Sequence, residues 1–319
     1  MYIINNIIQT MSNNLKRPSN TSLPPPSIKK IKIDVDSEFI DKMENYVISW
    51  LDKHDFKYVK LTPQDLICVW TLFKNGDIIE SNSNMVNLYY GIYYHIKKDY
   101  NKMDEYYNMS IQGGNTYAMI NLGFYYYENK KYDIMMKYYL LAKDNGNNDA
   151  HYYLGYYYKN VFEYDNMLKC YKFAIMHGNV DAMYSLGHYY YLKKDYENML
   201  VYYEMAVNFG DRITMFELGN YYADIKDYIN MKKYYSMAIE KNYVKAMMEM
   251  AKYWSSVDND MMANGYYLMA ADHGNSTAMY MVSQYYKKIN DFDNMMKYLR
   301  MAKDHGNYYA AVALRKCNK

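Results

Sequence analysis

The strongest constraint on this chain is a stretch of 32 residues that recurs along most of its 319-residue length. Residues 115–146, NTYAMINLGFYYYENKKYDIMMKYYLLAKDNG, are one copy. One position of the repeat is occupied by Gly91, Gly123, Gly155, Gly187, Gly219, Ala251 and Ser283. Another position closes the repeat with glycine in every copy but one, which has Asn242. A period between about 20 and 50 residues is typical of a solenoid, in which similar small units stack in a row.

Each repeat predicts two helices. The first half of residues 115–146 places apolar residues on one helical face, at Ala118, Leu122, Tyr125 and Tyr126. The second half does so at Met135, Tyr139 and Ala142. A polar break at residues 128–131 separates the halves, Asp133 is placed to assist the second start, and the closing glycine suits a left-handed helix end. Gly123 costs about 1 kcal/mol relative to alanine within a helix, so we expect it to let two helix backbones approach closely. The chain is therefore expected to be all-α, an α-solenoid of antiparallel helix pairs.

Two motifs in the repeat resemble a known superfamily. The pattern A-x-x-x-L-G-x-Y-Y at residues 118–126 resembles the first helix of a tetratricopeptide (TPR) repeat. The pattern A-x-x-x-G-N-x-x-A at residues 142–150 resembles the Sel1-like subgroup. The resemblance covers residues 84–307 as full repeats, with residues 308–319 beginning another as a C-terminal capping helix, and it implies a right-handed superhelix. The chain departs from the family in its period of 32 rather than about 34 residues, and in a methionine where the second TPR helix has alanine. We expect that bulkier residue to change the angle between the helices.

Composition narrows the class of protein. The net charge is +2 and 23% of residues are charged, which provides no strong field for nucleic acid. Together with abundant Asn, Ile and Lys, the 46 tyrosines and 28 methionines indicate an AT-rich genome, and in this respect the chain resembles repeat proteins of giant DNA viruses of amoebae, the mimivirus type.

The N-terminal 36 residues predict a disordered basic, proline-rich tail. They contain no signal-peptide apolar region and no stretch long enough to span a membrane, and the three cysteines are too far apart for a disulfide framework. We therefore expect an intracellular, cytoplasmic protein. Two basic clusters resemble a bipartite nuclear localisation signal, Lys16, Arg17, Lys29, Lys30 and Lys32. The alternative is that a lysine-rich tail contains such pairs by chance.

Residues 37–83 differ from the repeats. Apolar residues at helical spacing predict one helix containing Val47 and Trp50, and Thr62-Pro63 predicts the start of a second. The first repeat of a solenoid exposes an apolar face that an atypical terminal segment usually covers. We expect this segment to be such a cap. The alternative is a small adaptor domain that recruits a second protein.

No residue pattern predicts catalysis, a cofactor or a metal site. His177, His273 and His305 precede the closing glycines of different repeats, so they cannot converge on one ion. Metalloprotease, P-loop, nucleophile-elbow and paired-carboxylate motifs do not occur. We expect a protein that is not an enzyme.

The resemblance implies that the first helices of the repeats line a concave groove. The residues expected to line it are Ile120, Phe124, Tyr127, Tyr152, Tyr156, Tyr184, His188 and Tyr191. Because these are mostly aromatic, they do not match the Lys, Arg and Asn set with which chaperone-binding TPR proteins clamp a carboxylate. Aromatic residues on such a surface favour peptide recognition. The prediction is a monomeric protein–protein interaction scaffold for an unknown protein or peptide. The alternatives are an adaptor subunit of a modifying enzyme such as a ubiquitin ligase and, disfavoured by the charge, a nucleic-acid-binding protein.

Overall fold

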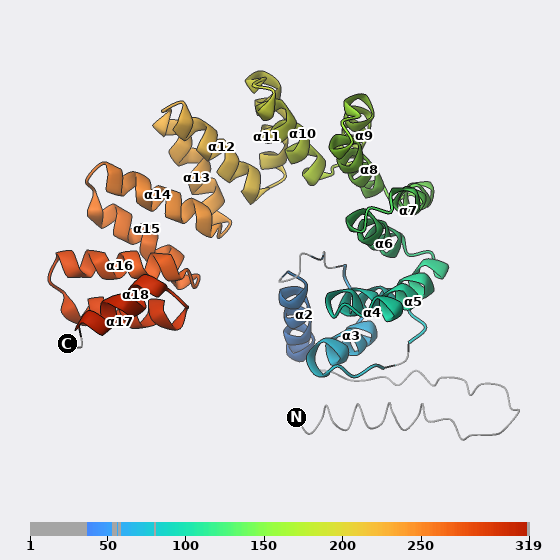
Figure 1. Cartoon of the computed structure of the whole chain (residues 1–319), viewed down its shortest axis with the longest axis horizontal. Coiled ribbons are helices and arrows are strands. Elements are labelled where there is room, and N and C mark those ends of the chain that lie inside the picture. The colour runs from blue at the N-terminus through green and yellow to red at the C-terminus, as the bar shows by residue number, and fades with distance from the viewer. Residues whose placement is uncertain (1–36, 53–55, 57–58, 80, 318–319) are drawn as a thin grey trace, which may run out of the picture. The chain divides into compact units, whose positions relative to one another are not determined.

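The protein is described from a computed structural model over residues 37–52, 56, 59–79 and 81–317. Over these ranges the regular elements are helices α2 to α18, without a strand, and they form the expected all-α solenoid (Figure 1). The chain divides into two compact units, Met1–Ala174 and Ile175–Lys319. Each unit is described by itself.

The first unit begins with two helices outside the repeats, α2 (Ser37–Asp52) and α3 (Pro63–Asn75). The repeat helices follow as α4 (Asn84–Ile96), α5 (Tyr100–Gln112), α6 (Thr116–Glu128), α7 (Tyr132–Asp144), α8 (Asp149–Asn160) and α9 (Tyr164–Met176), whose last residues belong to the second unit. The second unit continues with α10 (Val180–Leu192), α11 (Tyr196–Asn208), α12 (Arg212–Asp224), α13 (Tyr228–Glu240), α14 (Val244–Ser256), α15 (Asp260–Asp272), α16 (Ser276–Lys288), α17 (Phe292–Asp304) and α18 (Tyr308–Cys317).

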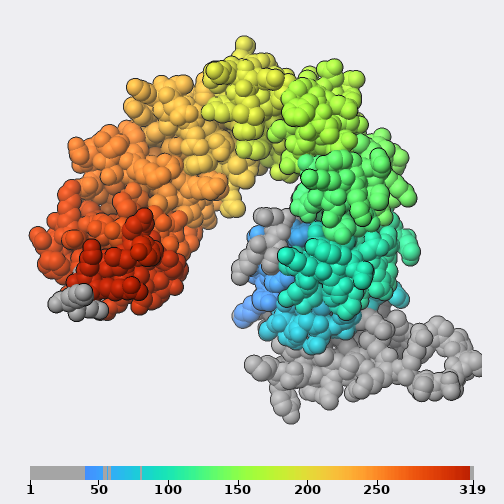
Figure 2. Space-filling view, in the orientation of Figure 1, coloured from blue at the N-terminus to red at the C-terminus, as the bar shows by residue number. Residues whose placement is uncertain are grey.

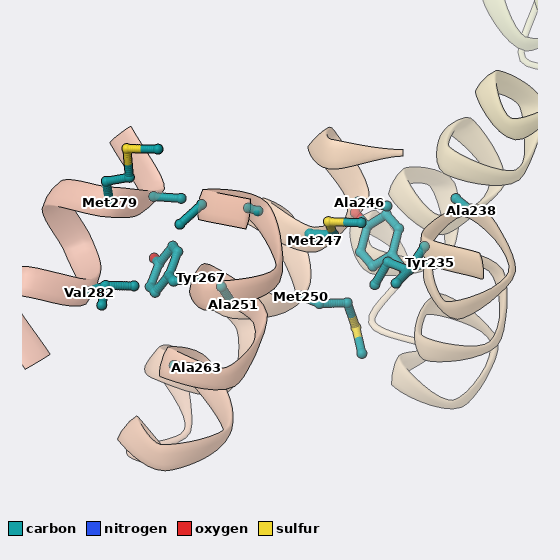
Figure 3. Close-up of a cluster of buried hydrophobic side chains, with 14 of the residues drawn as sticks. Tyr235, Ala238, Ala246, Met247, Met250, Ala251, Ala263, Tyr267, Met279 and Val282 are labelled. Carbon is teal, nitrogen blue, oxygen red and sulfur yellow. The ribbon is translucent and has the colours of Figure 1, made fainter. Parts of the chain in front are cut away.

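We call the first helix of each repeat helix A and the second helix B. Helix A packs on helix B of its own repeat, as α6 does on α7, and helix B packs on helix A of the next repeat, as α15 does on α16. In the space-filling view the repeats of each unit lie directly against one another (Figure 2). Figure 3 shows the resulting core in the second unit, where Tyr235 of α13, Met247 and Met250 of α14, Tyr267 of α15 and Val282 of α16 gather.

The recurring glycine of helix A makes room for a ring rather than for a backbone, so the expectation for Gly123 was wrong in its cause. A Cβ atom on Gly123 would lie 2.5 Å from the Tyr139 ring of helix B. The same clash, at 2.3–2.6 Å, recurs for Gly91, Gly155, Gly187 and Gly219 with Tyr107, Tyr171, Tyr203 and Tyr235. Each of these tyrosines is at most 3% exposed. The two repeats that lack the glycine have Tyr267, at 6% exposure, and Leu299 in the corresponding place.

The helix ends confirm the closing glycines and correct the predicted helix B start. The closing residues have left-handed φ values of 79–84° at glycine, and Asn242 has 57°. Helix B is capped by the residue directly before it, as Asp195 accepts a hydrogen bond from the Asn198 backbone N–H, and not by a residue at the Asp133 position. In α7 that place is taken by Lys131, which provides no side-chain cap. The helix A–helix B loops also contain a left-handed residue that is not glycine, at Lys98, Lys130, Phe162, Lys194, Lys226, Asp258 and Asn290.

The segment before the repeats packs on the first helix A. Thr62 caps α3 and Pro63 begins it, as predicted. Trp50 lies 3.9 Å from Phe73 between ring centroids, and Phe73 lies 5.9 Å from Tyr93 of α4. The Tyr89 hydroxyl of α4 donates to the Val59 carbonyl oxygen at 2.7 Å. The apolar end of the repeat array is therefore covered by aromatic side chains from this segment.

Candidate functional site

The predicted binding residues of the first unit include three aromatic rings in mutual contact. We call Phe124, Tyr127 and Tyr156 the first aromatic row. The Phe124 and Tyr127 centroids lie 6.3 Å apart with nearly parallel planes, and Tyr127 meets Tyr156 edge to face at 5.6 Å. Phe124 and Tyr156 are 38% and 37% exposed. The repeat produces this arrangement, because Phe124 and Tyr156 are separated by one period of 32 residues on successive helices A.

The hydroxyl end of this row is held by a neighbour. The Asn160 side-chain amide donates a hydrogen bond of 2.7 Å to the Tyr127 hydroxyl oxygen. Burial and the hydroxyls of Tyr156 and Tyr132 raise the pKa of Tyr127 above its ordinary value. The ring is therefore neutral at physiological pH, and the first aromatic row presents apolar faces with one fixed hydroxyl.

Two other predicted residues of the first unit do not belong to that row. Ile120 is only 4% exposed and lies in the apolar cluster that contains Met135 and Leu154. Tyr152 is half-buried, with its ring stacked on Tyr171 at 6.0 Å. Both residues share the helix A face, as their spacing predicted, but Ile120 contributes packing rather than accessible surface.

The predicted residues of the second unit form a second aromatic row on α10. Tyr184, His188 and Tyr191 follow one helical face, and their rings stack in sequence at centroid distances of 5.9 and 6.1 Å. The buried ring of Tyr203 lies parallel to Tyr184 at 5.9 Å and occupies the room left by Gly187. The repeating glycine–tyrosine pair thus supports the aromatic row from below.

The second aromatic row has carboxylate neighbours that sequence reasoning missed. Burial, followed by the negative charges of Glu217 and Asp211, raises the pKa of Tyr184. Burial, Asp224 and then Tyr196 and Glu217 raise the pKa of Tyr191. Glu217 and Asp224 belong to α12, the next helix A. Each lies one residue after a position that the groove prediction considered, Phe216 and Ala223, so one further residue on each helix would have found them.

Glu217 is held in place by a short polar chain. The Tyr235 hydroxyl donates to the Asn220 side-chain oxygen at 2.7 Å, and the Asn220 amide donates to the Glu217 carboxylate at 3.3 Å. Because Asn220 has its oxygen occupied by Tyr235, its amide nitrogen faces the carboxylate. Both partners of Asn220 are half-buried or buried, which restricts the carboxylate to one side of α12.

The remaining predicted residues give no site within the described ranges. Lys16, Arg17, Lys29, Lys30 and Lys32 lie outside the described residues. Among residues 37–52, 56, 59–79 and 81–317, no group of three or more His, Cys, Asp or Glu side chains is arranged to hold a metal ion. No helix in that part of the chain combines the length and apolarity needed to cross a bilayer.

Comparison with known proteins identifies the fold. No protein-family model and no curated protein matches the sequence. Among solved structures, a Sel1 repeat protein from Oxalobacter formigenes is 20% identical, with a TM-score of 0.50 over 68% of this chain and 99% of that one. Yeast Tom70 is 15% identical, with a TM-score of 0.53 over 99% of this chain and 72% of that one.

A protective antigen of uropathogenic Escherichia coli strains, described as displaying an SLR fold, is 16% identical with a TM-score of 0.45. The match covers 86% of this chain but only 63% of the length of the antigen. At these identities the likeness concerns the fold alone. The chain therefore has the architecture of Sel1- and TPR-like repeat proteins.

Proposed function

We propose that this protein is a non-catalytic scaffold that binds an extended or helical segment of a partner protein on its helix A faces. The observation that carries the proposal is the first aromatic row, in which Phe124 and Tyr156 remain more than one-third exposed although their rings contact Tyr127. Tyr and other large aromatic side chains supply much of the binding energy at protein interfaces, because they bury a large area with few rotatable bonds. The repeat architecture supports the proposal by presenting such faces side by side.

The test is affinity capture with the full-length chain and with a double variant, Phe124→Lys with Tyr156→Lys. We expect the double variant to lose a defined protein, because two charges would have to be buried in the contact. The matched control is Phe162→Lys, which introduces a charge at a 76% exposed ring in a helix A–helix B loop. A captured protein counts only if its purified form binds the wild type and the control with the same affinity. An unchanged set of proteins for a folded double variant would refute the proposal.

We also propose that residues 37–83 cap the repeat array. The contacts of Trp50 and Phe73 with α4 support a structural role. Trp50→Ala is then expected to lower the stability of the chain by about 3 kcal/mol or more, as truncation of a packed aromatic residue does. Tyr46→Lys, at a 39% exposed ring of α2, should leave the captured proteins unchanged. Loss of one partner in that variant would favour the adaptor alternative.

Nuclear import through the basic tail and a viral origin remain proposals from sequence and composition. Replacing Lys29, Lys30 and Lys32 by alanine in the full chain is expected to move a fluorescent fusion from the nucleus to the cytoplasm. An unchanged distribution would show that these lysines do not form a working signal.

A further inference from the structure

The surroundings of the second aromatic row indicate what kind of segment it accepts. The faces of Tyr184 and Tyr191 are electron-rich, and aromatic faces attract Lys and Arg side chains within about 6 Å of the ring centroid. His188 stacks between them, which makes the three rings one continuous surface on α10. All three residues are half-buried, so this surface is partly shielded from water and its electrostatic contacts are strengthened.

Carboxylates of the next helix A lie beside these rings. Glu217 influences the titration of Tyr184 and Tyr191, and Asp224 that of Tyr191, which places both negative charges near the row. Glu217 is half-buried and is oriented by the amide of Asn220. Within the described residues neither carboxylate forms an ion pair with a Lys or Arg side chain, whereas Glu249 on the following helix A pairs with Lys252. A half-buried carboxylate without a counter-ion is complementary to a cation from outside.

A guanidinium on an aromatic ring already occurs close to this place. Arg212 of α12 lies over the Tyr243 ring at 5.8 Å, and that ring in turn contacts Phe216 at 5.3 Å. The charges near the row are therefore three carboxylates, from Asp211, Glu217 and Asp224, and one cation that has an aromatic partner of its own. The local balance is negative although the whole chain carries +2.

We propose that the second aromatic row, with Glu217 and Asp224, binds a Lys- or Arg-containing segment of a partner protein. A cationic side chain of that segment stacks on Tyr184 or Tyr191 and pairs with the carboxylates of α12. This inference rests on the proposed function as a protein-binding scaffold and specifies the partner chemistry at one of its two rows. It differs from carboxylate capture, because here the scaffold supplies the negative charge and the partner supplies the positive charge.

The test is a fluorescence-polarisation titration of the full-length protein with two labelled peptides. One has arginines separated by Gly-Ser pairs, and the other has glutamates at the same places. We expect saturable binding of the arginine peptide only, and we expect Glu217→Gln with Asp224→Asn to weaken it by about tenfold or more. Tyr191→Leu should weaken it by a smaller factor, because it removes a ring face and leaves the carboxylates.

The control must separate a local site from general attraction. Glu197→Gln with Glu240→Gln removes the same charge from exposed positions of α11 and α13 in the same unit. The proposal requires that this control bind the arginine peptide within about twofold of the wild type. Equal losses in the two double variants, or no loss in either, would overturn it. If the arginine peptide does not bind but the first aromatic row still captures a defined protein, this inference fails and the proposed function stands. All variants are first compared by thermal unfolding, and a destabilised Tyr191→Leu is replaced by Tyr191→Phe with Glu217→Gln.

Discussion

The first and second aromatic rows occupy equivalent positions of the repeat and yet present different chemistry. Phe124 and Tyr127 correspond to His188 and Tyr191 after two periods of 32 residues. The following helix A contributes Tyr153, Tyr156 and Asn160 to the surroundings of the first row, and Glu217, Asn220 and Asp224 to those of the second. The first row is therefore extended by another ring, and the second is bordered by carboxylates. One backbone arrangement thus presents an apolar surface in one unit and an acidic aromatic surface in the other.

What the two rows share is the support below them. In both units a glycine on helix A leaves room for a buried tyrosine of helix B, and that tyrosine lies against helix A residues of the row or its neighbours. The support is constant along the array while the outward residues vary. This division explains how a repeat protein keeps its fold and changes its binding specificity from repeat to repeat.

The largest expected effect comes from removing the shared support. Gly187→Ala would place a Cβ atom 2.3 Å from the Tyr203 ring, which must then move away from Tyr184. We expect the free energy of unfolding to fall by about 1–3 kcal/mol, as overpacking of a core does. Gly265→Ala is the matched control, since no atom lies within 4 Å of its added Cβ. That control should gain about 0.5–1 kcal/mol. Similar results for the two variants in chemical denaturation would contradict the packing role of the glycine.

A second prediction transfers the chemistry of the second row to the first. Tyr156→Asn with Asn160→Asp reproduces the residues found at Asn220 and Asp224. The new carboxylate would accept a hydrogen bond from the Tyr127 hydroxyl, whose present partner is the Asn160 amide. We expect a further, weaker site for the arginine peptide, seen in isothermal titration calorimetry as a rise from about one to two peptides per chain. A stoichiometry that stays at one would show that the carboxylate at the Glu217 position is indispensable.

A third prediction concerns the helix starts, where the units also differ. α11 of the second unit has Asp195 as its N-cap, and α7 of the first unit has Lys131 without a side-chain cap. Lys131→Asp should raise the free energy of unfolding by about 1 kcal/mol, because its carboxylate would accept a free backbone N–H. Lys137→Asp makes the same charge change on the exposed side of α7 and should not stabilise. Equal stability changes in the two variants would attribute the effect to net charge.

The smallest effect is a pH dependence of two helix starts in the second unit. Hydrogen bonds from the Asn230 and Asn294 side chains lower the pKa of Asp227 and Asp291 below the ordinary value of 3.8. A lowered pKa in the folded state means that the ionised carboxylates stabilise the fold above that ordinary value. This stabilisation is lost as the pH falls through the lowered folded values. Asp227→Asn, which keeps the cap without a titrating group, should unfold with a weaker acid dependence than the wild type. The exposed Asp165→Asn should not differ from the wild type in thermal melts over the same pH range.

The fold followed from the sequence because the pattern repeats. The period, the two helices per repeat and the left-handed closing glycines were each repeated several times, so that chance agreement was excluded. The role of Gly123 was misjudged, because a small residue shows that something comes close and does not show whether it is a backbone or the Tyr139 ring. The left-handed residues at Lys130 and Phe162 were missed, since neither residue type favours that conformation.

The candidate site was predictable only in part. Spacing placed Phe124 and His188 on one helix face, but it could not tell that Ile120 on the same face is buried. Glu217 was missed because a groove defined by positions on one helix ignores the flank of the next helix. Such contacts depend on how repeats stack, which the departures from the related repeats leave undetermined at the sequence level.

The most direct measurement is site-specific photocrosslinking in the full-length protein. A photoreactive phenylalanine derivative is placed at Phe124 in one sample and at Phe162 in another, both in exposed rings of the first unit. If the helix A face binds the partner, one defined protein crosslinks strongly from Phe124 and not from Phe162. Crosslinking of equal strength from both positions, or only from Phe162, would contradict binding at the aromatic row.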